Sequence, residues 1–131
     1  MILGCLVDIS RLNRAICRLT DADEQISRFR MLQASGWQDK DVVLKCRVQL
    51  DATEKLVSTV IRHMEGRKYD ELWQMSNLYL KEALNTVQSM KYGLDGGKMP
   101  EHDDVNRCIR RMSRSCVELM GKTMVYKEEG E

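Results

Sequence analysis

Four arginines near the end of the chain have the residue type and the spacing to bind an anion. They recur at i, i+3, i+4 and i+7, which places them on one narrow face of a helix: Arg107, Arg110, Arg111 and Arg114. A guanidinium offers a planar fork of donors that fits phosphate and carboxylate groups. No acid interrupts the stripe before Glu118. We take these arginines as candidate binding residues; the alternative is a solvated face, or pairing with acids of a neighbouring helix or subunit.

A second stripe, Arg11, Arg14 and Arg18, lies near the start of the chain. In a ring of four helices the first and last helices are neighbours, so the two stripes could merge into one basic surface. Nucleic acid or another polyanion is one partner that such a surface would bind. The arginines lack interleaved aromatic residues, however, which makes the signal for nucleic acid weak.

The two histidines complete no catalytic or metal-binding motif. Residues 63–65 read His-Met-Glu, the spacing of a zinc deaminase, but no Pro-Cys-x-x-Cys follows, so we interpret them as charges at a helix end. His102 precedes Asp103 and Asp104, a group more typical of a solvated helix start than of a metal site. The chain also lacks Glu-x-x-His, GxGxxG, GxxxxGK[ST] and GxSxG. We therefore predict no enzyme, no metal and no cofactor.

The five cysteines are odd in number and none is spaced CxxC, which argues against a secreted disulfide framework. We expect free thiols, most of them on apolar helix faces, and an intracellular setting, cytoplasmic or nuclear. No basic segment precedes the apolar start of the chain, so a signal peptide is not expected. No stretch approaches the ~20 apolar residues of a membrane span, so no membrane partner is expected either.

The composition is that of one folded domain. The chain has 131 residues, 43% of them hydrophobic and 31% charged, with a net charge of +1. This balance excludes wholesale disorder and any strong global field, so an electrostatic function would depend on local clustering.

The spacing of apolar residues predicts four helices, at about 2–34, 38–65, 70–92 and 101–125, and a frayed acidic tail at 127–131. Gly66 and Gly93 are expected to end the second and third helices. Long helices with short connections favour an all-α, antiparallel up-down-up-down four-helix bundle spanning residues 1–131.

The first helix poses a question of phase, because its apolar spacing slips near Thr20. We favour one long helix, straight or kinked, over two helices meeting there. Its expected inner face is Cys5, Ile9, Leu12, Ile16, Leu19, Ala22, Ile26 and Phe29. The expected inner face of the third helix is Leu72, Met75, Tyr79 or Leu80, Ala83, Val87 and Met90, and that of the fourth is Val105, Ile109, Met112, Cys116, Leu119 and Met120.

Several apolar residues indicate whether the chain packs them in its core or uses them to contact a partner. We expect most of the nine methionines to fill the core. Trp37, Tyr69 and Trp73 are expected to cap a bundle end or to anchor an interface. The apolar start, Ile2, Leu3, Leu6 and Val7, suggests an uncovered patch and hence self-association.

These observations favour a non-enzymatic helical interaction module, an adaptor or assembly subunit that acts through protein contacts or self-association. The alternative is an accessory protein that binds nucleic acid or phosphate through the arginine stripes. Salt separates the two, because phosphate contacts release counterions and weaken steeply with ionic strength.

Overall fold

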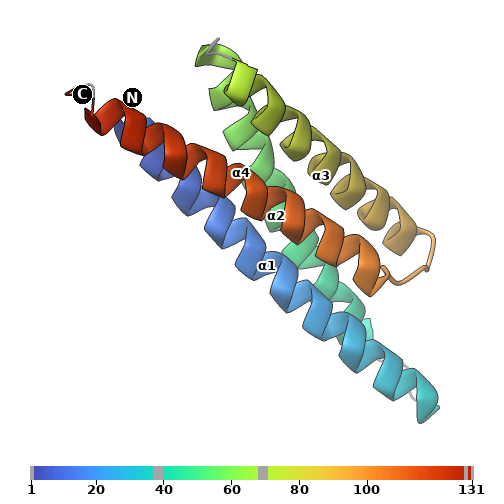
Figure 1. Ribbon diagram of the computed structural model, residues 1–131. Coiled ribbons are helices and arrows are strands. Elements are labelled where there is room, and N and C mark those ends of the chain that lie inside the picture. Colours follow the sequence, from blue (N-terminus) through green and yellow to red (C-terminus); the bar gives the residue numbers. More distant parts are fainter. Residues whose placement is uncertain (1, 37–39, 68–70, 129, 131) are drawn as a thin grey trace.

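The computed structural model describes the chain except for residues 1, 37–39, 68–70, 129 and 131, and except for the side chains of residues 2, 67, 71–74 and 126. The described residues form four helices and no strand: α1 (Ile2–Ala34), α2 (Lys40–Arg67), α3 (Glu71–Asp95) and α4 (His102–Glu128). The helices alternate in direction, and each contacts its two neighbours in a ring that α1 and α4 close (Figure 1). The predicted all-α, up-down-up-down four-helix bundle is confirmed.

The core is built on a strict heptad spacing. In α1 the buried positions follow steps of three and four without a break: Cys5, Asp8, Leu12, Ala15, Leu19, Ala22 and Ile26. The same steps run through α2 (Cys46, Leu50, Thr53, Val57, Val60 and Met64), α3 (Ser76, Leu80, Ala83, Val87, Met90 and Leu94) and α4 (Val105, Cys108, Met112, Ser115 and Leu119). A period of 3.5 residues keeps one seam of each helix facing the bundle axis.

The phase slip predicted near Thr20 does not occur, and α1 is one continuous helix (Figure 1). Ile9 and Ile16, which we assigned to the inner face, lie half-buried beside the seam. The seam itself uses Asp8 and Ala15. An assignment by side-chain size overlooks a small or charged residue at a core position, and this produced the apparent slip.

The same correction applies to α3 and α4. Ser76 is buried where we expected Met75, and in α4 Cys108 and Ser115 are buried while Ile109 is only half-buried. Met120, also assigned to the inner face, is exposed. Of the two alternatives Tyr79 and Leu80, Leu80 is the core residue, and the Leu72 side chain lies outside the described residues. Ser115 fits the core because its hydroxyl bonds within the fold: Ser115 Oγ donates to the backbone carbonyl oxygen of Ser76 over 3.1 Å. The hydroxyl of Ser76 itself has no hydrogen-bond partner among the described residues.

The glycines end the helices differently from what we expected. Gly66 lies inside α2, and α3 continues two residues beyond Gly93. The cap of α3 is Gly97, at φ +84°, where its N–H donates to Leu94 O over 3.0 Å and Lys98 N–H donates to Gly93 O over 2.8 Å. This pair of bonds satisfies carbonyls at the helix end, and it requires the left-handed conformation that glycine adopts without strain. At the other end of the chain α4 runs to Glu128, so part of the expected tail is helical.

Candidate docking surface

The arginines of α4 lie on its outer side, but most of them are engaged within the fold. Arg107 Nη2 donates to Asp104 Oδ1 over 2.9 Å. Arg111 Nε lies 3.0 Å from Glu82 Oε2 of α3.

Arg114 is engaged more loosely. Its Nε lies 3.9 Å from Glu118 Oε1, and its guanidinium stacks 5.3 Å above the ring of Tyr79. Arg110 is exposed and makes no ion pair among the described residues. Three of the four charges in the stripe are therefore at least partly balanced, and one is free to meet a partner.

The arginines of α1 turn toward α2. Arg11 Nη1 donates to Asp8 Oδ1 over 3.1 Å and lies 3.1 Å from His63 Nδ1. Arg18 Nη1 donates to Gln49 Oε1 over 3.4 Å. Arg14 is exposed, without an ion pair among the residues that the structure describes.

The structure does not bring the two arginine stripes together. Although α1 and α4 are neighbours, other residues fill the contact between them. Cys116 Sγ donates to Asn13 Oδ1 over 3.8 Å, and Arg30 Nη2 donates to Glu101 Oε2 over 2.6 Å. The α1 stripe faces α2 and the α4 stripe faces α3, so the expected merged basic surface does not form.

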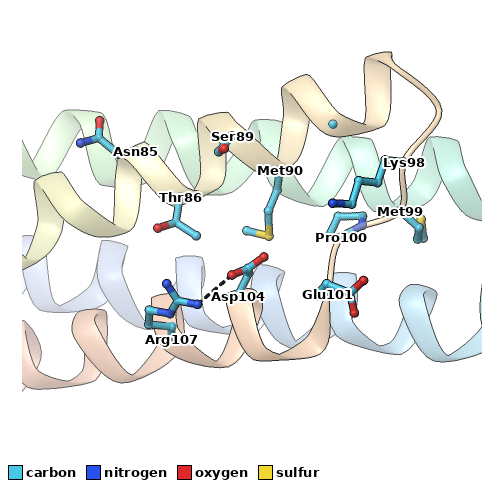
Figure 2. A pocket seen from close by; sticks show the side chains of 11 residues that line it. Asn85, Thr86, Ser89, Met90, Lys98, Met99, Pro100, Glu101, Asp104 and Arg107 are labelled. Carbon is cyan, nitrogen blue, oxygen red and sulfur yellow. Dashed lines mark hydrogen bonds and ion pairs between the residues drawn. The ribbon is translucent and has the colours of Figure 1, made fainter.

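Two hollows adjoin these arginines. A groove of about 490 Å³ between α1 and α2 is lined by Arg14, Cys17, Arg18, Asp21, Ala52, Lys55 and Leu56. A second hollow, of about 350 Å³, lies between the end of α3 and the start of α4 (Figure 2). Figure 2 shows Arg107 on its wall, joined to Asp104, with Lys98 and Glu101 at the same hollow. The hollow in Figure 2 balances its two cations with two acids. The groove between α1 and α2 is more basic, because three cations face the single acid Asp21.

One functional-looking cluster escaped the sequence analysis. Asp8 is completely buried at a core position of α1, and its Oδ1 contacts both Arg11 and, at 3.0 Å, Nδ1 of His63. A charge inside a core is stable only when it is paired. The heptad spacing predicts that Asp8 faces the core, because Asp8 lies three residues after Cys5 and four residues before Leu12, and both of those residues are buried.

The second histidine has the connectivity of a hydrolase triad without its geometry. His102 Nδ1 contacts Asp23 Oδ1, and His102 Nε2 lies 3.4 Å from Ser27 Oγ. A nucleophile and its base approach more closely than that, at about 2.6–3.2 Å, and Ser27 is exposed on the helix. We interpret the three residues as a polar contact that joins the start of α4 to α1. Among the described residues, no group of three or more His, Cys, Asp or Glu is placed to hold a metal ion.

The most unusual surface is apolar. On the outer face of the C-terminal half of α4, Val117 is 68% exposed, Met120 53% and Met124 66%. Leu3 and Leu6 of α1 are also exposed, and the start of α1 lies beside the end of α4 (Figure 1). We call these five residues the apolar outer face.

The methionines are divided between the core and the surface, and Met120 and Met124 belong to the apolar outer face. Met64, Met90 and Met112 are buried and Met99 packs half-buried against the core, whereas Met31, Met75, Met120 and Met124 are exposed. The expectation that most methionines fill the core is therefore wrong for the described residues. Exposed methionines adapt to different partner surfaces. Trp37 and Tyr69 lie outside the described residues, as does the side chain of Trp73, and so does the Ile2 side chain from the expected N-terminal patch.

The geometry defines a four-helix bundle with an exposed apolar face formed by α4 and the start of α1. Comparison with family models, with curated proteins and with solved structures found no match. No helix among the described residues has the length and apolar character needed to cross a membrane.

Proposed function

We propose that this protein is a non-enzymatic helical interaction module that docks a protein partner on its apolar outer face. The observation that carries the proposal is the exposure of Val117, Met120 and Met124 along one side of α4. A helix in a soluble bundle needs one apolar stripe, and α4 already buries one against the core. A second apolar stripe costs solubility unless another surface covers it.

A polyanion is a weaker candidate for the partner. Arg107 and Arg111 are held by Asp104 and Glu82, and the two stripes face different neighbours. The positive potential of each stripe is therefore reduced and divided. Arg14, Arg18 and Arg110 make no ion pair among the described residues, and Arg18 contacts only the neutral amide of Gln49. Because Arg110 lies on a different helix from the other two, these charges are divided between two faces and give only a small counterion release on binding nucleic acid.

The cellular setting that we propose is reducing and intracellular. All five cysteines are free, and four of them are buried. Burial raises the pKa of Cys46, Cys108 and Cys116 to about 11, so these thiols behave as small apolar side chains of the core.

The test compares two variants in capture from a native lysate. Val117→Glu with Met124→Glu places charges on the apolar outer face, whereas Arg14→Gln with Arg18→Gln leaves that face intact and removes basic charge from the groove between α1 and α2. We expect the first variant to lose proteins that the wild-type chain retains and the second to keep them, with or without nuclease. If the pattern is reversed and nuclease releases the captured material, the polyanion interpretation replaces ours.

A further inference from the structure

The outer side of α4 carries a second heptad stripe whose chemistry changes along its length. Its positions are separated by steps of four and three residues: Arg110, Arg114, Val117, Gly121, Met124 and Glu128. All six are exposed. The stripe is basic at its first end, small and apolar in its middle and acidic at its last end. We call it the outer seam, and regular spacing of this kind is what a helix needs to pack against another helix.

Gly121 in the middle of the outer seam has no explanation within the chain. A Cβ atom built at this position would meet nothing within 4 Å, and the residue sits inside a helix, where glycine is unfavourable relative to alanine. The fold itself would therefore accept a larger residue. A glycine on a helix surface allows another backbone to approach closely, so the position indicates where an external helix would cross.

We propose that the outer seam binds a second copy of this chain, with the two α4 helices antiparallel. This inference rests on the proposed docking function and names its partner. In this arrangement Val117 packs against Gly121 of the second copy, and the stem of Arg114 lies over Met124 of the second copy. Arg110 pairs with Glu128 of the second copy. Because the contact has two-fold symmetry, each of these pairs occurs twice.

Charge complementarity selects this partner and this direction. Arg110 and Glu128 each lack an ion pair among the described residues, and they lie at opposite ends of the same stripe. An antiparallel copy brings them together at both ends, whereas a parallel copy would set Arg110 against Arg110 and Glu128 against Glu128. Leu6 and Met120 lie exposed toward the α1 side of the seam and extend the apolar area available to the second copy.

The experiment is a charge swap followed by sedimentation equilibrium of the purified chain. Arg110→Glu opposes two carboxylates at each end of the dimer, and Glu128→Arg opposes two guanidiniums. We expect each variant alone to dimerise about tenfold more weakly than the wild type. The reason is that each reversal replaces attraction by repulsion in two exposed charge pairs of the dimer. An equimolar mixture of the two variants restores every pair, so the mixture should dimerise as the wild type does.

Two further variants serve as controls. Glu24→Arg reverses an exposed charge on the outer side of α1 and should leave dimerisation unchanged. Val117→Glu places a carboxylate at the centre of the seam and should abolish dimerisation, and circular dichroism should show that the helices of each variant are retained.

The outcomes separate this inference from the proposed function. A wild-type chain that stays monomeric at tens of micromolar overturns the second copy as partner, yet the docking function stands if Val117→Glu with Met124→Glu still loses captured proteins. The second copy and the docking function are both overturned if the wild-type chain is monomeric and Val117→Glu with Met124→Glu also captures the same proteins as the wild type. If the mixture of Arg110→Glu and Glu128→Arg does not regain wild-type dimerisation, the antiparallel arrangement is overturned, because that arrangement pairs residue 110 of one copy with residue 128 of the other.

Discussion

Asp8 and His63 meet between α1 and α2, with Oδ1 3.0 Å from Nδ1, and the Asp8 side chain is completely buried. Arg11 contacts the same carboxylate oxygen from α1. A carboxylate in the core is thus compensated from two helices at once. Such a pair adds little net stability compared with an apolar residue, but removing one partner leaves a costly buried charge.

Arg11→Met tests this arrangement, because methionine keeps the apolar stem of arginine and removes its charge. We expect the free energy of unfolding to fall by about 2 kcal/mol, the cost of losing a hydrogen-bonded partner of a buried charge. Arg14→Met is the matched control, since Arg14 is exposed without an ion pair among the described residues, and its effect should stay within about 0.5 kcal/mol. Urea denaturation measures both; equal effects would show that the buried carboxylate does not depend on Arg11.

The cysteines give a chemical test of the core. Cys17 is exposed while the other four are buried, and a pKa of about 11 keeps the thiols of Cys46, Cys108 and Cys116 protonated at mildly alkaline pH. Only a thiolate attacks a disulfide reagent efficiently. We expect one thiol per chain to react rapidly in the native protein and all five in denaturant. Cys17→Ser should remove the rapid reaction, and a persisting rapid phase would contradict the burial of the other four.

An ion-pair cluster between α2 and α3 predicts how stability changes with acid. Lys91 Nζ lies 2.6 Å from Asp51 Oδ1 and 3.2 Å from Glu54 Oε2. The hydrogen bond from Lys91 lowers the pKa of Asp51 below its ordinary 3.8. A lowered pKa in the folded state contributes stability above the ordinary value, and this contribution is lost as pH falls through the lowered one.

Lys91→Met should therefore reduce the free energy of unfolding at neutral pH by about 1 kcal/mol, the scale of a partly exposed pair. The difference from the wild type should shrink as the pH falls below the ordinary pKa of Asp51. Denaturation curves across this range measure it. A difference that stays constant into strong acid would mean that Lys91 stabilises the fold by packing rather than by charge.

Two glycines should respond in opposite ways to substitution by alanine. Gly97→Ala forces a side chain into the left-handed conformation at the end of α3, so it should destabilise the chain by about 1–2 kcal/mol. Gly121→Ala should stabilise the monomer by up to about 1 kcal/mol, because alanine favours the helix. The same substitution should weaken dimerisation through its added Cβ. Gly121→Ala that strengthens dimerisation would contradict the close approach proposed at the outer seam.

The sequence predicted the number, order and direction of the helices because long apolar periodicity and few breaking residues leave little choice. It did not identify which residues complete the core seam. Asp8 and Ser115 are polar yet buried, and their contacts within the fold, with Arg11 and His63 for Asp8 and with Ser76 for Ser115, stabilise that burial. Helix ends were also misplaced, since the hydrogen bonds that make Gly97 rather than Gly93 the cap depend on the backbone of the following loop.

The arginines show more clearly what residue spacing alone does not predict. Spacing placed Arg107, Arg110 and Arg114 on the outside of α4, as the structure does. Spacing did not reveal that Glu82 of α3 holds Arg111, because the register between two helices is set by core packing. Leu3 and Leu6 of the apolar outer face were expected to be uncovered, and they are exposed. Its α4 part was missed for a related reason: Met120 was assigned to the core by its type, and the heptad seam assigns it to the surface.

A distance between two spin labels tests the antiparallel contact most directly. Asn106 is exposed on α4, beside the outer seam rather than in it, so Asn106→Cys in a Cys17→Ser background carries one accessible label per chain. If Val117 opposes Gly121 of the second copy, the two labelled positions lie about 40 Å apart along the helix axes, at 1.5 Å per residue. We predict that separation by pulsed dipolar spectroscopy, and its loss in Val117→Glu. A short separation near 10 Å, the distance between parallel packed helices, or the absence of any dipolar interaction would contradict the proposed contact.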